Sequence, residues 1–465
     1  MASRSPCSTC ARRGGPPLRS TTNSSSGGQL DHSNGTEPEL TAIRWASYRR
    51  AVTTTPEVSS PAPPPRPALL TGPLLLRFVS VLGASTSFYL LLSAVPGYAT
   101  TGGAGDGAAG LATGALMLTT VAGELATPAL VNRFGYRAVL AVGLVLLGAP
   151  ALALTASREL WWIVGICLLR GLGFAFTVVA GGALTASLIP AERRGEGLAV
   201  VGIVGGVPSL VALPLGVWLA AHVGYGVVCT VGGVAALAAV LTVPGLPGRG
   251  KAPGRPVGMY EALRTGGLRR PAVVFAVTAV AAGIIVTFLP LAVAASGSTT
   301  VAVALFVQPA ATTVARWLAG RRGDRRGAGG LVLPGLLLSA AGTLLMAPTG
   351  SSVAVVVGVG VFGAGFGIAQ NSTLTLMYTR VSAAGYGTVS ALWNLAYDAG
   401  MGIGAAAFGP LAAGTGYPWA FALTGAAMLT AVVQARDDTG RTPPSRRTGG
   451  AGPRRHRRRA PDPHP

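Results

Sequence analysis

Twelve apolar stretches, each long enough to cross a lipid bilayer, recur between residues 74 and 434. A hydrocarbon core about 30 Å thick requires about 20 residues of helix. Short turns that contain glycine, proline or arginine separate the stretches. The sequence therefore predicts an all-α integral membrane protein with twelve transmembrane helices, at about residues 74–97, 109–131, 138–156, 160–184, 197–221, 225–245, 271–294, 299–319, 330–348, 352–377, 387–412 and 416–434.

The composition supports a membrane protein and excludes two other classes. Half of the residues are hydrophobic, only 11% are charged, and the mean hydropathy is +0.53. These values argue against an ordinary soluble enzyme and, for most of the chain, against a disordered protein. The net charge of +21 does not describe a nucleic-acid surface, because sixteen of the 36 basic residues lie at the two ends of the chain, at 4–66 and 441–459. We therefore expect anionic lipid, and no nucleic acid, as the partner of the tails.

The chain divides into five parts by composition. Residues 1–70 are rich in Ser, Thr, Pro, Gly and Arg and predict a disordered cytoplasmic tail, although a start codon further downstream is an alternative. Residues 436–465 predict a second disordered basic tail in the cytoplasm. Between them, a basic cytoplasmic connection at 247–270 separates two six-helix bundles, at 71–246 and 271–435.

Basic residues in the connections predict the orientation in the membrane. The even-numbered connections carry fifteen arginines and lysines, Arg316 lies near the same side at the end of the eighth stretch, and the odd-numbered connections carry Arg158 alone. Basic residues in short loops stay on the cytoplasmic side. We therefore expect a multi-pass protein of the cell membrane with both termini in the cytoplasm.

The two predicted bundles share landmarks at a constant spacing. An offset of 192 residues maps the glycines at 171 and 173 onto those at 363 and 365, and the glycine at 224 onto that at 416. A constant register across separate landmarks indicates a duplicated six-helix unit.

The connections after the second and eighth stretches carry a matching motif, and residues 70–436 resemble the major facilitator superfamily. The second copy keeps all four positions of G-x-x-x-D-R-x-G, whereas the first has Pro128 and Asn132 for the glycine and the aspartate. The resemblance implies a conformational latch at each copy, and the first latch is expected to be the weaker because Asn132 carries no charge for a helix N-terminus. The latch residues are Asn132, Arg133, Gly135 and Arg137 in the first copy and Gly320, Asp324, Arg325 and Gly327 in the second.

Charged side chains inside predicted spans are candidates for function, because each costs about 2.5 to 3.5 kcal/mol at a helix centre. Arg77 and Arg316 lie near cytoplasmic helix ends, where we expect them to reach the interface. Arg170 resembles the arginine of proton-coupled facilitators. An arginine does not release its proton at physiological pH, so we expect Arg170 to act beside an acid by lowering the pKa of a neighbouring carboxylate. The proton carrier must therefore be an acid, Asp398 or Glu124, with a latch contact as the alternative for Glu124.

Polar and aromatic residues of the tenth and eleventh helices predict a substrate cavity between the bundles. Asn394 and Asp398 are four residues apart and share a helix face. Lipid would exclude such groups, and a wall of amides and aromatic rings suits an amphiphilic organic molecule. The expected cavity residues are Gln370, Asn371, Trp393, Asn394 and Tyr397.

These features predict a secondary active transporter, and the run 363–416 resembles the drug and arabinose efflux permease branch. That resemblance implies proton-coupled efflux of a small organic molecule by alternating access. Uptake of a sugar or metabolite by proton symport, and a non-transport membrane protein on the same fold, remain alternatives. We expect a monomer. We also expect that the protein is not an enzyme and has no cofactor or metal, because the loops of the body contain no paired carboxylates, histidine cluster or Ser-His pattern.

Overall fold

The computed structural model describes residues 70–103, 105–190, 194–248, 264, 266–293, 298–381 and 385–439. The predicted tails and most of the predicted central connection lie outside these residues. By its internal contacts the chain divides between Pro65 and Arg66, and every described residue belongs to the second unit.

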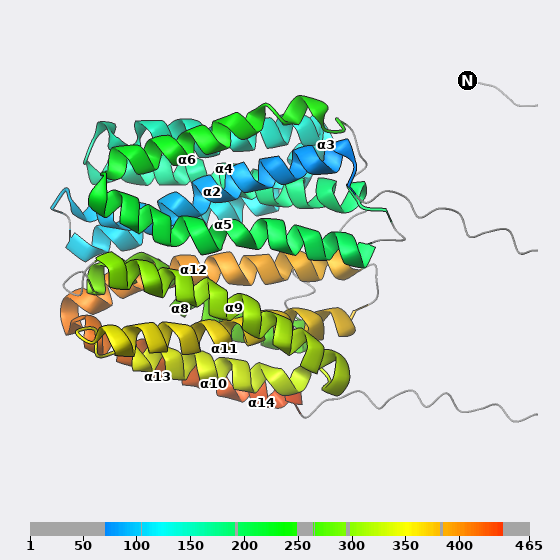
Figure 1. The fold of residues 1–465 in the computed structure, drawn as a ribbon. Helices are drawn as coiled ribbons and strands as arrows, with labels where there is room; N and C mark the ends of the chain where they lie inside the picture. The colour runs from blue at the N-terminus through cyan, green and yellow to red at the C-terminus, as the bar shows by residue number, and fades with distance from the viewer. Residues whose placement is uncertain are drawn as a thin grey trace, which may run out of the picture. The chain divides into compact units, whose positions relative to one another are not determined.

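The described residues form helices and no strands (Figure 1). Short 3-10 turns at Leu154–Ala156, Val243–Gly245 and Leu429–Ala431 extend three of the helices. The α-helices are α2 (Gly72–Thr100), α3 (Gly105–Ala153), α4 (Leu160–Leu188), α5 (Arg194–His222), α6 (Tyr225–Val240), α8 (Gly266–Ala292), α9 (Ser298–Arg326), α10 (Gly329–Leu345), α11 (Ser352–Thr379), α12 (Tyr386–Thr415), α13 (Tyr417–Met428) and α14 (Val432–Thr439).

These helices account for the twelve predicted spans. The helical run of α3 contains one non-helical residue, Gly135, which separates the predicted second and third spans. A 3-10 turn joins α13 to α14, and together they make the twelfth span. Within the described part of the chain, nine helices are long and apolar enough to cross a membrane, and the 52-residue helix Gly105–Ala156 is one of them. The predicted all-helical membrane fold is confirmed.

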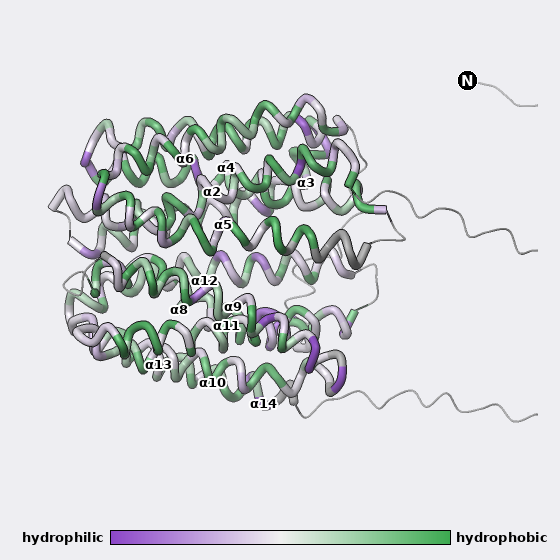
Figure 2. The backbone as a smooth tube through the Cα atoms, viewed as in Figure 1, coloured by the Kyte–Doolittle hydropathy of each residue, from purple (hydrophilic) through white to green (hydrophobic). Residues whose placement is uncertain are grey.

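The helices pack as two bundles, α2 to α6 and α8 to α14 (Figure 1). Two pairs of helices make most of the contact between the bundles: α3 packs against α12, and α5 packs against α9. Figure 2 shows hydrophobic residues along most of the length of the helices. Large apolar side chains such as Trp161, Leu241 and Val353 are largely exposed, as expected for a multi-pass protein whose outer faces contact lipid.

The offset of 192 residues holds in three dimensions. Gly135 and Gly327 both have positive φ, at 83° and 86°, and so do Gly224 and Gly416, at 103° and 77°. The helix contacts repeat as well. A methyl group on Gly171 would overlap the carbonyl oxygen of Leu116, and one on Gly363 would lie 2.5 Å from the carbonyl oxygen of Gln308. Leu116 and Gln308 are themselves 192 residues apart, so the two bundles use the same close helix crossing.

Candidate functional site

A cavity of about 870 Å³ lies between the two bundles. Its wall is built from α2, α5, α8, α9, α11 and α12, so both bundles contribute. Among the described residues, the charged side chains of the wall are Arg316 and Arg321, and no acidic side chain lines the cavity. The aromatic side chains are Tyr89, Trp317, Phe366 and Tyr397, and the polar ones are Ser209, Gln308, Thr312, Thr313, Gln370 and Asn371.

The cavity reaches one end of the bundle. Because successive helices alternate in direction, the connections that carry Arg133, Arg137 and Arg325 lie at one end, which we call the basic end. Gly320 and Arg321 of α9 belong both to this end and to the cavity wall.

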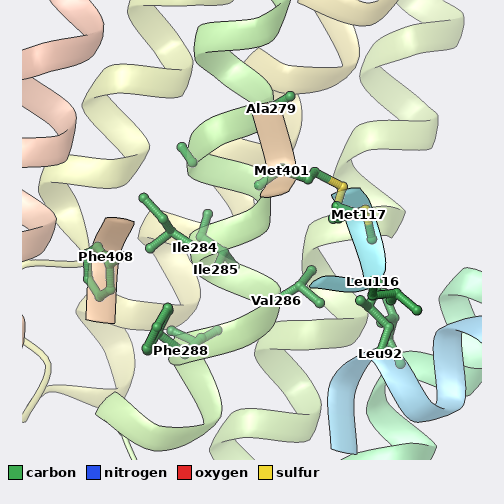
Figure 3. Close-up of a cluster of buried hydrophobic side chains, with 14 of the residues drawn as sticks. Leu92, Leu116, Met117, Ala279, Ile284, Ile285, Val286, Phe288, Met401 and Phe408 are labelled. Carbon is green, nitrogen blue, oxygen red and sulfur yellow. The ribbon is translucent and has the colours of Figure 1, made fainter. Parts of the chain in front are cut away.

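A close-packed seam between α3 and α12 lies alongside the cavity and runs toward the opposite end. The helices run antiparallel, and glycine lets their backbones approach. A methyl group on Gly110 would overlap the carbonyl oxygen of Ala405, one on Gly114 would lie 3.2 Å from Cβ of Ala406, and one on Gly402 would lie 2.8 Å from Cβ of Met117. Figure 3 shows Met401 of α12 reaching toward Met117 of α3.

Further contacts extend the seam to the opposite end. The Thr287 hydroxyl of α8 donates to the Thr113 hydroxyl of α3 over 3.2 Å. At the start of α3, Asp106 lies within hydrogen-bonding reach of Tyr417, the first residue of α13. The two bundles are therefore closed against each other at the end that faces away from the basic connections.

Glu124 and Asp398 meet across the same two helices, nearer the basic end than the glycine contacts of the seam. Their side chains lie within hydrogen-bonding reach, Glu124 on α3 and Asp398 on α12. Asp398 is 5% exposed and Glu124 is half-buried. Two carboxyl groups hydrogen-bond only when they hold a proton, so this contact between the bundles requires a shared proton.

Two tyrosines of the cavity wall stand close to this carboxyl pair. Tyr89 of α2 and Tyr397 of α12 both line the cavity and both interact electrostatically with Asp398. Both tyrosines therefore border the cavity and interact with the carboxyl pair.

The predicted cavity residues divide into two groups. Gln370, Asn371 and Tyr397 line the cavity, and Asn371 is oriented by its Nδ2, which donates to the carbonyl oxygen of Arg316 over 3.3 Å. Trp393 lies outside the wall. Its ring stacks on Phe275 with centroids 4.3 Å apart, and its Nε1 donates to Thr373 Oγ1 over 3.2 Å. Asn394 is half-buried and also lies outside the wall.

Arg170 does not contact either acid in the described structure. Its side chain is 1% exposed and binds backbone instead: Nε donates to the carbonyl oxygen of Leu147 over 3.2 Å, and Nη2 donates to that of Ser87 over 3.0 Å. Arg170 therefore ties α4 to α3 and α2 inside the first bundle, beside Cys167.

The expectation that Arg77 reaches the membrane interface is wrong. Arg77 is 4% exposed, and its Nε and Nη2 donate to the carbonyl oxygens of Gly181 and Thr177, each over 3.2 Å. Because Gly181 has no side chain, the guanidinium fits against α4. Arg316, expected at the same interface, lines the cavity instead.

The first predicted latch contacts its own bundle. Gly135 approaches the backbone after α6, where a methyl group would lie 2.6 Å from the carbonyl oxygen of Gly248. The Arg137 side chain donates to the carbonyl oxygen of Leu246. Asn132 and Arg133 are exposed and, among the described residues, form no hydrogen bond with the second bundle.

In the second predicted latch, two glycines hold special positions. Gly327 takes the positive φ described above, and a methyl group on Gly320 would lie 3.2 Å from Nδ2 of Asn371. Arg325 is exposed, and the side chain of Asp324 lies outside the described part of the structure.

Sequence and structure comparisons identify the family. The model of the Major Facilitator Superfamily matches residues 77–405. The chain belongs to the Major Facilitator Superfamily. A chloramphenicol resistance protein of Streptomyces lividans is 31% identical over 357 residues, which cover 74% of this chain and 88% of that protein.

Solved structures show the same facilitator fold. A point mutant of the nucleoside transporter NupG superposes with a TM-score of 0.65 at 12% identity, covering 78% of this chain and 99% of that one. NupG without the mutation gives 0.63 at 12% identity, covering 80% and 100%. Members of this superfamily move small molecules across membranes, so the chain is a transporter and not an enzyme.

Most of the cavity wall was not predicted from the sequence, including Tyr89, Gln308, Thr312 and Arg316. The internal repeat could have identified Arg316. The offset of 192 residues maps Glu124 onto Arg316 and Gly206 onto Asp398, so the two acids between α3 and α12 mark Arg316 and Gly206 as candidate site positions between α9 and α5.

Proposed function

We propose that this protein is a proton-driven exporter of a small organic molecule in the cell membrane, with its basic end and both termini in the cytoplasm. The observation that carries the proposal is the Glu124–Asp398 pair, because it joins the two bundles at the seam that separates the cavity from the opposite side. The chloramphenicol resistance protein of Streptomyces lividans supports efflux as the direction.

The pair couples protons to the movement of the bundles. With one shared proton the two carboxyls attract and hold the seam closed. Without it, two unit charges 4 Å apart repel by about 4 kcal/mol at an effective dielectric constant of about 20, which favours separation of α3 from α12. Loss of the proton to the cytoplasm therefore favours the state that opens to the outside.

Opening of the seam then completes the exchange. The substrate leaves to the outside, and one carboxyl takes a proton from that side, which lets the seam close again. One proton enters for each substrate exported, and an inward movement down 100 mV contributes about 2.3 kcal/mol. The protein works as a monomer, and its two bundles rock against each other around a cavity near the middle of the membrane.

Inverted membrane vesicles test the proposal. Chloramphenicol and a panel of amphiphilic organic molecules are added to energised vesicles, and the luminal pH is recorded. We expect a transported compound to make the lumen more alkaline, and both Asp398→Asn and Glu124→Gln to reduce this signal at least tenfold. Glu159→Gln, an exposed acid at the start of α4, is the matched control and should leave the signal unchanged.

The opposite results would contradict specific parts of the proposal. Acidification of the lumen on adding substrate would indicate symport. A full signal in both variants of the pair would show that the proton uses another route.

A further inference from the structure

The charged side chains of the cavity wall, among the described residues, are all positive. Arg321 lies at the rim, stacked over the ring of Trp317 at 4.0 Å, but Arg316 lies deeper, more than one helical turn along α9. Its guanidinium forms no hydrogen bond or ion pair with any described residue. Arg316 is exposed within the cavity, so its charge is available to an anionic ligand.

The internal repeat relates Arg316 and Gly206 to the carboxyl pair. Arg316 is the equivalent of Glu124, and Gly206 is the equivalent of Asp398, each pair being 192 residues apart. In the seam between α3 and α12 two carboxyls meet. In the matching contact between α9 and α5 an arginine and a glycine take their places, and both line the cavity.

The space beside Gly206 is open. A methyl group on Gly206 or on its neighbour Gly205 would find no atom within 4 Å. Where one bundle interface holds the carboxylate of Asp398, the other therefore offers a cation and room for a group of similar size.

We propose that the cavity binds an organic molecule through an acidic group, which Arg316 holds beside Gly206. The flat guanidinium of arginine fits a carboxylate through two parallel hydrogen bonds. The apolar body of the ligand would lie against Tyr89, Phe366 and Tyr397, which line the same cavity. This inference rests on the proposed function, because it takes this cavity to be the transport site.

Ligands of different charge should bind to this cavity with different affinities. An organic cation with no acidic group meets two arginines and, among the described residues, no acid in the wall, so it binds weakly. A neutral molecule can accept a hydrogen bond from Arg316, but it does not form the bidentate pair of a guanidinium with a carboxylate, which is the stronger contact. We therefore expect acidic ligands to bind tightest, neutral acceptors next and cations least.

Binding to the purified full-length protein tests this order without any transport. The probes share one ring system and differ in charge: 1-naphthaleneacetate and 1-naphthylmethylammonium. Isothermal titration should give the anion at least a tenfold lower Kd. Arg316→Gln should raise the Kd of the anion at least tenfold, and Arg316→Lys should restore part of the affinity.

Two further variants sharpen the result. Gly206→Asp places a carboxylate of the protein beside Arg316 and should also abolish binding of the anion, since the site is then occupied. Arg322→Gln removes the same charge from an exposed residue of α9 outside the cavity wall and is the matched control, expected to change the Kd less than threefold. Thermal melting of each variant confirms that it is folded.

The outcomes separate this inference from the proposed function. Equal Kd values for the two probes, or equal loss in Arg316→Gln and Arg322→Gln, would overturn the inference. An anion preference that depends on Arg316, in a protein whose vesicles show no proton movement, would uphold the inference and overturn proton-coupled export.

Discussion

At the scale of single residues, the glycines of the repeat set how closely the helices pack. Gly171 lies where a methyl group would overlap both the carbonyl oxygen of Leu116 and the hydroxyl oxygen of Thr119. Gly182, on the same helix, has no atom within 4 Å of that position. The two glycines therefore differ in packing and share a helix.

We expect Gly171→Ala to destabilise the protein by about 1 to 3 kcal/mol, because the added methyl forces α3 and α4 apart. Gly182→Ala should be neutral or slightly stabilising, since alanine favours a helix. Melting temperatures of the two variants in the same detergent provide the measurement. Equal temperatures would mean that the close approach of α3 and α4 does not limit stability.

The positive-φ glycines give a second matched pair. Gly135 and Gly327 are equivalent, but only Gly135 also meets a backbone atom, the carbonyl oxygen of Gly248. A left-handed conformation costs a side chain about 1 to 2 kcal/mol. Both alanine variants should therefore melt at a lower temperature than the unmodified protein, and Gly135→Ala should lose more; the reverse order would contradict the contact with Gly248.

The sequence located the important charges but not their partners. A charged residue inside an apolar span is visible from the sequence because its cost depends on the span alone. Its partner depends on which helix faces overlap. Arg170 was predicted to act beside an acid and binds two backbone carbonyls, whereas Glu124 and Asp398 were each singled out and their contact was not foreseen.

At the scale of elements, the apolar stretches predicted the helices but not the geometry of the connection between the second and third spans. Two spans were expected on either side of a turn near residue 135, but α3 is continuous except for Gly135. One residue with positive φ supplies the whole change of direction, and hydropathy does not report φ. The pairing of α3 with α12 was equally invisible, because it joins residues nearly 300 positions apart.

The seam between α3 and α12 predicts a specific crosslink. Cβ of Ala406 would lie 3.2 Å from a Cβ at Gly114, near the 3.5 to 4.5 Å found across disulfides. With the four native cysteines replaced by alanine, the double variant Gly114→Cys and Ala406→Cys should form a disulfide under mild oxidation. Transport should fall at least tenfold and recover on reduction.

A neighbouring pair serves as the control for this crosslink. Ile403 lies on the exposed face of α12, so Gly114→Cys with Ile403→Cys should remain reduced and active. Retention of transport in the oxidised first pair would contradict a cycle in which α3 and α12 separate.

At the scale of the whole molecule, the arginines of the connections predict that the basic end faces the cytoplasm, and the cavity reaches that end. Gly350, in the connection between α10 and α11, is exposed at the opposite end, and Arg325 is exposed at the basic end. In intact cells a membrane-impermeant maleimide should label Gly350→Cys, and should label Arg325→Cys only after permeabilisation. The opposite labelling pattern would invert the orientation and, with it, the side from which the cavity fills.

The repeat of 192 residues has an evolutionary consequence. After the duplication, the glycines at helix crossings were held in place by the neighbouring backbone, whereas positions at the bundle interfaces that lack such a backbone neighbour could diverge, and Glu124 and Arg316 differ at equivalent positions. We therefore expect architecture and the charge of the cargo to depend on different positions of the same helix. Relatives that keep the glycines but differ at positions 206 and 316 should carry molecules of different charge, so new transporters can arise by exchanging two side chains on an unaltered scaffold.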